Sequence, residues 1–199
     1  MKAELRNISK SYGDKQVLSD ITMTFEEGIT CIMGPSGRGK TTLAYIIAGL
    51  ITPDSGVVAG CGRTDENRPA EADDKKISFM FQEDRLLEWE TALKNVLFVT
   101  NSARRAAAVK LLTQAGLADS MDKKASKLSG GMKRRVALCR ALIADCDILI
   151  LDEPFKGLDS GIKPSIMDMV KEHSAGKITI CITHDPTEAV FLSGRVVEL

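Results

Sequence analysis

Apolar and polar residues alternate along the first part of the chain. Residues 3–8 and 17–25 show the period of two that is typical of β-strands with one buried face. Residues 29–33 form a third, shorter run that is mostly apolar. The pattern predicts that the chain begins with β-structure.

The next apolar residues take the spacing of a helix. A first helix is predicted over residues 43–48, and Gly49 follows at the position where a glycine commonly ends a helix. Four later segments have the same spacing, and the first two look like an inserted helical unit: 91–99, 102–115, 129–144 and 161–173.

Short apolar runs lie between these helices. They cover residues 77–81, 148–151 and 178–182, and the run 148–151 has the composition of a strand buried on both faces. Alternation of strands and helices predicts a parallel sheet with right-handed crossovers. Residues 52–56 are predicted to form a turn, and the polar residues 60–76 a surface loop.

Composition narrows the class of protein. The chain has 199 residues, 44% of them hydrophobic, which suits one well-buried domain. Its 27 basic residues balance 27 acidic ones, so no net field would draw it to nucleic acid or anionic lipid. No apolar signal region and no run of about 18 apolar residues occurs, so neither secretion nor a membrane span is expected.

The five cysteines include no C-x-x-C pair. We expect them to be reduced thiols, most of them buried as small hydrophobes. The predicted helix 129–144 carries three consecutive basic residues, Lys133, Arg134 and Arg135. They are interpreted as a solvated face or as contacts within a helical subdomain.

A glycine-rich turn joins the apolar run 29–33 to the first helix. Its glycines let successive backbone N–H groups point at phosphate oxygens, and the dipole of the following helix adds to the attraction. In such a phosphate loop Lys40 reaches the β- and γ-phosphates, and the Thr41 hydroxyl serves Mg²⁺. The turn predicts nucleotide binding by Gly34, Pro35, Ser36, Gly37, Arg38, Gly39, Lys40, Thr41 and Thr42.

Polar residues follow two of the predicted parallel strands. Asp152 and Glu153 come at the end of one strand, and His184 comes at the end of another. The carboxyl ends of parallel strands share one edge of the sheet, and that edge faces a ligand crevice. We therefore expect the three side chains at a common ligand site.

Four further segments accompany the phosphate loop. Residues 128–132 are similar to an LSGGQ signature, and residues 147–154 look like an extended Walker B motif. Gln82 resembles a Q-loop glutamine, and His184 a switch histidine. In this order, across nearly the whole chain, they resemble the ATPase subunit of an ATP-binding cassette (ABC) transporter.

The resemblance implies a fold and a domain plan. The fold is α/β, a P-loop NTPase with a RecA-like parallel core sheet and an N-terminal antiparallel β portion. Residues 1–199 would form a single ABC ATP-binding domain. A helical subdomain would be inserted in it at about residues 83–140.

The resemblance also implies roles for the site residues, with ATP and Mg²⁺ as the bound groups. Asp152 would hold Mg²⁺ through water, and Glu153 would act as general base or orient the attacking water. His184 would contact the γ-phosphate. Gln82 would touch the metal or water and report to a membrane partner. The catalytic set is then Glu153, His184 and Lys40, and the metal set is Thr41, Gln82 and Asp152.

Three more features of the family complete the nucleotide site. Tyr12 matches the A-loop aromatic that stacks on adenine, although an aromatic at a strand end also suits core packing. Ser129, Gly130 and Gly131 leave a bare helix N-terminus that can meet a γ-phosphate. The resemblance implies that a second cassette, packed head to tail, holds this phosphate, and that Asp159 communicates across the dimer.

The segment after Gln82 suggests a branch of the family. Residues 82–96 look like the corresponding segment in importers of nitrate, sulfonates and taurine, where a proline usually takes the place of Glu88. Trp89, with its apolar neighbours, is either subdomain core or part of a groove for a permease. The expected partners are membrane permease subunits and an extracytoplasmic solute-binding protein, with no nucleic acid, at the cytoplasmic face of the membrane.

Other classes of function compete with import. A soluble ABC ATPase of DNA repair or translation usually has long coiled coils or two fused cassettes, and neither is seen. A regulatory module that has lost hydrolysis would not need Glu153 and His184. An ABC exporter is a further alternative.

Two departures from the family pattern bear on activity. Met132 replaces the usual signature glutamine but leaves the serine and both glycines, so hydrolysis is expected to survive. The chain ends at Leu199, soon after the switch histidine, whereas many relatives continue. No accessory regulatory domain is therefore expected.

Overall fold

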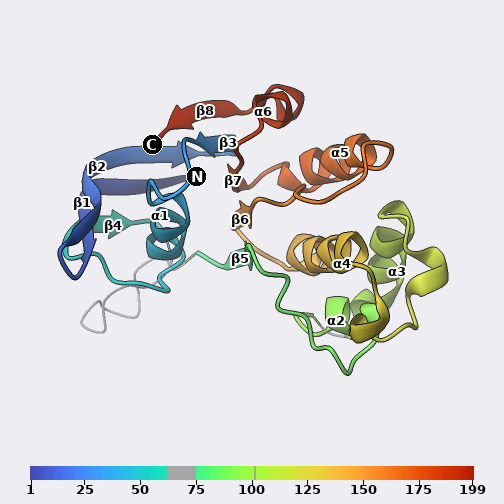
Figure 1. Ribbon diagram of the computed structural model, residues 1–199. Coiled ribbons are helices and arrows are strands. Elements are labelled where there is room, and N and C mark those ends of the chain that lie inside the picture. The colour runs from blue at the N-terminus through green and yellow to red at the C-terminus, as the bar shows by residue number, and fades with distance from the viewer. Residues whose placement is uncertain (62–74, 101) are drawn as a thin grey trace. The chain divides into compact units, whose positions relative to one another are not determined.

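The computed structural model describes residues 1–61, 75–100 and 102–199 (Figure 1). The chain divides into two compact units, which we describe separately. The first unit comprises Met1–Phe79, Cys146–Asp152 and Ser174–Leu199. The second unit comprises Met80–Asp145 and Glu153–His173.

An antiparallel sheet forms the N-terminal part of the first unit. Strands β1 (Lys2–Tyr12), β2 (Lys15–Glu26) and β4 (Ser55–Ala59) lie in the order β2-β1-β4. β1 and β2 form a hairpin with a two-residue turn, in which Gly13 takes a φ of 58°. The first two strands were predicted, but β4 was not.

A five-stranded sheet forms the rest of the first unit. Its order is β5-β6-β7-β3-β8, and the pairs β6–β7, β7–β3 and β3–β8 are parallel. Every residue of β6 and β7 is buried, as expected for strands covered on both faces. The bounds are β3 (Gly28–Met33), β5 (Ile77–Met80), β6 (Ile148–Asp152), β7 (Ile178–Ile182) and β8 (Arg195–Glu198).

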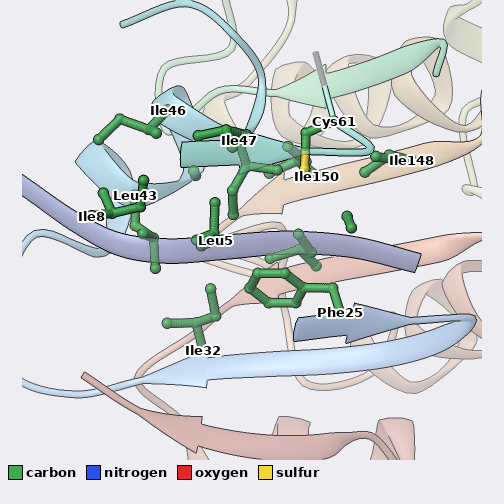
Figure 2. Packing of buried hydrophobic residues seen from close by; sticks show 14 of the residues in the cluster. Leu5, Ile8, Phe25, Ile32, Leu43, Ile46, Ile47, Cys61, Ile148 and Ile150 are labelled. Atoms are coloured by element: carbon green, nitrogen blue, oxygen red, sulfur yellow. The ribbon is translucent and has the colours of Figure 1, made fainter. Parts of the chain in front are cut away.

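Helix α1 (Lys40–Ile47) packs between the two sheets of this unit. Figure 2 shows its apolar side chains among those of the antiparallel sheet and of β6. Full burial of each large apolar side chain stabilises the fold by about 2 kcal/mol, so this cluster holds α1, and the loop before it, in place. Its largest labelled members are Leu5, Ile8, Phe25, Ile32, Leu43, Ile46, Ile47, Ile148 and Ile150.

Helix α6 (Pro186–Leu192) completes the first unit. Asp185 caps it by accepting a hydrogen bond of 2.9 Å from the backbone N–H of Thr187, and Pro186 follows at the first helical position. The sequence analysis did not predict this helix or the strand β8 that follows it.

The second unit is helical. Helices α2, α3 and α4 all contact one another (Figure 1). The α-helices are α2 (Ala92–Leu97), α3 (Arg105–Gln114), α4 (Gly130–Ile143) and α5 (Lys163–Ser174). Three short 3₁₀ helices connect them: η1 (Ser102–Arg104), η2 (Ala118–Ser120) and η3 (Ala125–Lys127).

Capping residues explain where these helices begin. Thr91 accepts a hydrogen bond of 3.2 Å from the backbone N–H of Lys94 at the start of α2. Ser129 accepts one of 3.4 Å from Met132 at the start of α4. Both satisfy N–H groups that the first turn of a helix leaves without an intrahelical partner.

Three further predictions concern the cysteines, the loop 60–76 and membrane-spanning helices. All five cysteines lie among the described residues, where they are buried and form no disulfide, as expected. Most of the predicted loop 60–76 lies outside the described residues. Among the residues that are described, no helix combines the length and the apolar composition needed to cross a membrane.

Candidate nucleotide site

The glycine-rich turn follows β3 and leads into α1. Gly34, Gly37 and Gly39 have φ values of 139°, 82° and 87°, a region that side chains other than glycine rarely enter. A Cβ on Gly39 would lie 2.7 Å from the side chain of Leu18 and 2.9 Å from that of Val17. The sequence therefore needs glycine here both for the turn and for close packing on β2.

Lys40 is the first residue of α1, and its side chain turns back over the loop. Its Nζ donates hydrogen bonds of 2.8 Å to the carbonyl oxygens of Gly34 and Pro35. Among the residues that the structure describes, no side chain caps the N-terminus of α1. The loop thus combines an ammonium group with uncapped N–H groups of a helix start, which is the donor set that phosphate oxygens need.

Thr41 and Asp152 meet at the edge of the parallel sheet. The Thr41 hydroxyl donates a hydrogen bond of 2.8 Å to the Asp152 carboxylate, which is 1% exposed at the end of β6. A hydroxyl and a carboxylate oxygen are hard ligands of the kind that Mg²⁺ prefers. These two residues therefore fit a magnesium ion beside a bound triphosphate.

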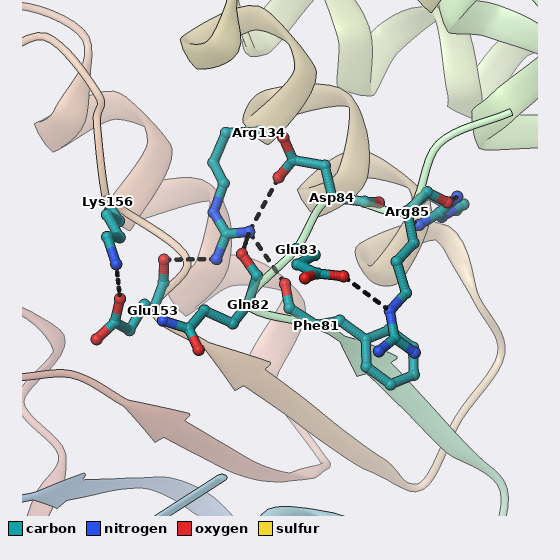
Figure 3. Close-up of polar contacts among 9 residues, drawn as sticks. Phe81, Gln82, Glu83, Asp84, Arg85, Arg134, Glu153 and Lys156 are labelled. Atoms are coloured by element: carbon teal, nitrogen blue, oxygen red, sulfur yellow. Dashed lines mark hydrogen bonds and ion pairs between the residues drawn. The ribbon is translucent and has the colours of Figure 1, made fainter. Parts of the chain in front are cut away.

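Glu153 follows directly and has an unusual backbone. Its φ is 50°, a left-handed conformation that costs about 1–2 kcal/mol for a residue with a Cβ. Its carbonyl oxygen accepts hydrogen bonds from the Arg134 guanidinium, at 2.6 Å, and from the backbone N–H of Lys156, at 3.2 Å. Its carboxylate forms an ion pair of 2.8 Å with Lys156 Nζ (Figure 3).

The segment around His184 is anchored on both sides. The preceding Thr183 hydroxyl donates to the buried carboxylate of Glu188 and accepts a hydrogen bond of 3.1 Å from the backbone N–H of Asp185. His184 itself is exposed at the end of β7. Its neighbours therefore fix its backbone while its side chain faces outward.

Gln82 is the second residue after β5, and it is exposed. Its carbonyl oxygen accepts a hydrogen bond of 2.9 Å from Arg134 (Figure 3). Ser129 and Gly130 are also exposed, and a Cβ on Gly130 would meet nothing within 4 Å. Ser129 and Gly130 thus leave the start of α4 exposed, whereas a Cβ on Gly131 would lie 3.3 Å from the carbonyl oxygen of Gly157.

For Tyr12 and Trp89 the sequence left open whether the side chain packs in the core, and the structure answers this question. Tyr12 is 50% exposed, with Lys10 Nζ 5.8 Å from its ring centroid, so the core-packing interpretation is wrong. Trp89 is 68% exposed, so it is not subdomain core either. Asp159 is exposed, and its carbonyl oxygen accepts hydrogen bonds from Ile162 and Lys163 where α5 begins.

The predicted residues fall into two groups. The first unit carries Tyr12, the phosphate loop, Asp152 and His184, and a direct hydrogen bond joins Thr41 to Asp152. The second unit carries Gln82, Ser129, Gly130, Gly131, Glu153 and Asp159. Within it, Arg134 joins the main chains of Gln82 and Glu153.

The sequence analysis missed the role of Arg134. The interpretation as a solvated face is wrong for this residue, since it is 5% exposed, and the alternative of contacts within the helical unit holds. One signal was present in the sequence. Arg134 lies three, four and seven positions before the buried residues Ala137, Leu138 and Ala141, which is the spacing of a single helix face.

Comparisons with known proteins agree with this geometry. The family model described as "ABC transporter" matches residues 18–156, which is more than half of the chain. The chain belongs to the ABC transporter family. It is an ATP-binding cassette, and the family supports ATP binding and an ATPase activity. A second model, for an AAA domain described as a putative AbiEii toxin of a type IV system, matches residues 124–190.

Curated relatives of this ABC cassette are subunits of importers. The chain is 41% identical over 199 residues to the aliphatic sulfonates import ATP-binding protein SsuB 1 of Rhodococcus jostii, with 98% of this chain and 78% of that protein covered. It is 41% identical over 210 residues to the sulfate/thiosulfate import ATP-binding protein CysA of Escherichia coli. That match covers 99% of the chain but 57% of CysA, so the chain spans little more than half of that relative.

Solved structures of ABC cassettes have the same fold. A dimeric cassette, MJ0796, in a post-hydrolysis state bound to ADP and phosphate, gives a TM-score of 0.85 at 32% identity. Another dimeric structure of MJ0796, described as a bacterial ABC transporter cassette, gives 0.86 at 32% identity. Each match covers 99% of this chain and 94% of the other. The predicted P-loop NTPase fold is therefore confirmed.

Proposed function

We propose that this cassette is the ATP-hydrolysing subunit of an importer, and that it couples hydrolysis to the movement of a solute through membrane permease subunits. The observation that carries the chemistry is the hydrogen bond between Thr41 and Asp152, next to the loop that Lys40 crosses. Import is supported by relatives that are named as import ATP-binding proteins. Residues 1–199 would form one domain, with the helical subdomain at about 83–140.

The nucleotide would be held by the phosphate loop. The backbone N–H groups between Gly34 and Thr42, together with Lys40, would bind its phosphates, and Tyr12 would stack on adenine. Thr41, Asp152 and Gln82 would hold Mg²⁺, which when bound screens the charge of the triphosphate. The oxygen ligands of Thr41 and Asp152 fit this ion.

The reaction is in-line attack of water on the γ-phosphorus. Glu153 would accept the proton of this water or orient it, and His184 would contact the γ-phosphate. Glu153 has the carboxylate for this role, and its left-handed backbone is held by hydrogen bonds to its carbonyl oxygen. Strained conformations of this kind are concentrated at functional sites.

The complete site would need a second cassette packed head to tail. Ser129, Gly130 and Gly131 would cap the γ-phosphate of nucleotide bound to the partner, and Asp159 would communicate across the dimer. The exposed, open start of α4 supports this arrangement. Similar cassettes that were solved as dimers support it as well. We expect a homodimer.

The membrane partners would be permease subunits, with an extracytoplasmic solute-binding protein on the far side. The cassette would then lie at the cytoplasmic face, as a peripheral protein. Exposed apolar residues of the second unit support such a contact, since Trp89 is 68% and Phe98 is 70% exposed. No nucleic acid is expected, because the chain has no net charge.

Calorimetry with ATP and phosphate-release assays test the chemistry. The wild-type chain should bind ATP and release phosphate in the presence of Mg²⁺. Lys40→Ala should weaken ATP binding at least about tenfold, because it removes the ammonium group that crosses the loop. Lys171→Ala, an exposed lysine on α5, serves as the matched control. Unchanged affinity in Lys40→Ala would contradict the assignment of the loop.

Copurification tests the class of function. Capture of an integral membrane protein with the tagged chain would favour transport. Turnover that rises with DNA or ribosomes would instead favour the soluble class of ABC ATPase, and ATP binding without phosphate release would favour a regulatory module. The direction of transport can be measured with the complex of cassette and permease in vesicles. Import and export are distinguished by the side of the membrane on which the solute accumulates.

A further inference from the structure

Arg134 is a buried, charged residue in the middle of a network of main-chain acceptors. It lies in the second turn of α4 and is 5% exposed. The other buried residues of this helix are apolar. An arginine keeps its charge in any protein environment, so its burial must be compensated by acceptors. The identity of those acceptors indicates what the residue does.

Four acceptors surround the guanidinium (Figure 3). Nη1 lies 3.0 Å from the carbonyl oxygen of Phe81, 2.9 Å from that of Gln82 and 2.9 Å from the carboxylate of Asp84. Nη2 donates to the carbonyl oxygen of Glu153 at 2.6 Å. The acceptors thus come from two segments that are separated by about 70 residues of sequence, and all of them belong to the second unit.

The two segments carry the residues proposed to act on the metal, the water and the γ-phosphorus. Gln82 opens one of them, and Glu153 opens the other. The hydrogen bond to Glu153 also supports a backbone that has a φ of 50°. Removing it would let this backbone relax toward a more common conformation and would turn the carboxylate away from its present direction.

We propose that Arg134 is a positioning residue for ATP hydrolysis, because one guanidinium fixes the main chains of both Gln82 and Glu153. This inference rests on the proposed function. It extends that function by assigning to the signature helix α4 a structural link to the two residues within the same chain. Arg134 would act through the residues that it holds, since its hydrogen bonds run to the Phe81, Gln82 and Glu153 carbonyls and to the Asp84 carboxylate.

The planar guanidinium is needed for this arrangement. Its two terminal nitrogens donate in different directions, one toward the segment after β5 and one toward Glu153. A lysine ammonium is a single point of charge and cannot keep both sets of bonds at these distances. A glutamine offers one NH₂ group and no charge, which leaves Asp84 without its ion pair.

The test compares Arg134→Gln and Arg134→Lys with wild type. Turnover per bound ATP should fall at least about tenfold in Arg134→Gln, since misplacement of catalytic groups by about 1 Å costs up to about 100-fold. The Kd for ATP should stay within about twofold, because Lys40 and the loop are unchanged. The Mg²⁺ concentration for half-maximal turnover should rise, because Gln82 would be less well placed. Arg134→Lys should fall between the two.

Arg104→Gln is the matched control. Arg104 also donates from a guanidinium to a backbone carbonyl oxygen of α4, that of Ile143 at 2.7 Å, but it touches no residue assigned to the site. Its loss should leave turnover and the Mg²⁺ requirement at wild-type values. A melting curve and the number of ATP molecules bound per chain correct each variant for any unfolded fraction.

The outcomes separate the inference from the proposed function. A wild-type chain that hydrolyses no ATP would overturn both. If the wild-type chain hydrolyses ATP and Arg134→Gln is equally active, the positioning role alone is overturned. The same holds if the lower turnover of Arg134→Gln is explained wholly by a smaller number of chains that bind ATP. If Arg134→Gln does not fold, Arg134→Lys decides, and wild-type turnover and Mg²⁺ dependence in that variant would contradict the proposal.

Discussion

Glu153 combines an acidic side chain with a backbone conformation that acidic residues rarely adopt. Its neighbours hold it there, through the hydrogen bond from Arg134 to its carbonyl oxygen and the turn that Lys156 closes. The ion pair with Lys156 Nζ adds little to stability, because the lysine side chain is 56% exposed. The surrounding main chain is thus the stronger support of this residue.

Glu153→Gln should separate binding from hydrolysis. The amide has nearly the same size and keeps the backbone bonds, but it cannot accept the proton of the attacking water. We expect ATP affinity near the wild-type value and a turnover at least about 100-fold lower, which corresponds to about 2.7 kcal/mol in the barrier. Phosphate release and light scattering with ATP measure the two effects, and the variant should accumulate as an ATP-bound dimer.

Glu172→Gln is the control for this prediction, because Glu172 is an exposed residue of α5 with no assigned role. It should hydrolyse ATP at the wild-type rate. Wild-type turnover in Glu153→Gln would remove Glu153 from the role of base.

The sequence predicted the positions of some residues correctly and those of others wrongly or not at all. Thr41 and Asp152 meet as the motifs predicted, because a loop before a helix and the end of a parallel strand lie at one edge of the sheet. Arg134 was misjudged because charge alone suggested solvent, while its position on the helix face pointed inward. The exposure of Trp89 depends on tertiary packing, which periodicity does not report.

At the scale of elements, the turn before β4 is attached to β1 by the side chain of Asp54, in addition to the backbone hydrogen bonds between the strands. Asp54 accepts hydrogen bonds from Lys10 Nζ at 2.6 Å and from the backbone N–H of Ser11 at 2.7 Å, both on β1. These bonds lower the pKa of the Asp54 carboxyl below its ordinary value, with the Lys10 contact as the larger cause. The turn is thereby tied to the strand that β4 joins.

Asp54→Asn should lower the melting temperature slightly, in a pH-dependent way. A carboxyl whose pKa is lowered in the folded state stabilises that state above its unfolded pKa, and this contribution is lost as the pH falls through the folded pKa. We expect a decrease in Tm of no more than about 3 °C at pH 7, since the pair is exposed, and a difference that shrinks as the pH falls below the ordinary pKa of an aspartate.

Thermal melts at a series of pH values measure this effect. Asp14→Asn, on an exposed residue of the first hairpin turn, is the control and should show no such trend. A decrease in Tm of the same size at every pH would contradict an electrostatic origin.

Most elements could be predicted, and the failures have physical reasons. The patterns found the strands β1, β2, β3, β5, β6 and β7 and the helices α1 to α5, because each contains an alternating, mostly apolar or helically spaced run of residues. β4 was missed because serine, glycine and proline around it give a turn signal, while its pairing with β1 is set by distant residues. The helix α6 had a start signal in Asp185 and Pro186, but its short length hid it.

At the scale of the whole molecule, the reactivity of the cysteine thiols can be used to follow unfolding. All five are buried, and burial raises the pKa of the Cys139 thiol to about 12. The hydrogen bond with Cys31 and burial both raise the pKa of the Cys181 thiol. Since a reagent must reach the sulfur atom, the burial of all five thiols should keep them unreactive while the chain is folded.

Thiol labelling at pH 8 tests this expectation. The folded chain should react slowly, and five thiols should react rapidly once guanidinium chloride unfolds it. The denaturant midpoint of labelling should match that of circular dichroism. Fast labelling of a folded sample would contradict the burial of the thiols.

The chain passes from one compact unit to the other at four peptide bonds, and one of these joins Asp152 to Glu153. The proposed ligand of the metal and the proposed acceptor of the proton are therefore consecutive in the chain but belong to different bodies. The peptide bond between them keeps their Cα atoms about 3.8 Å apart, so the two carboxylates stay neighbours in the chain although each is packed into a different unit.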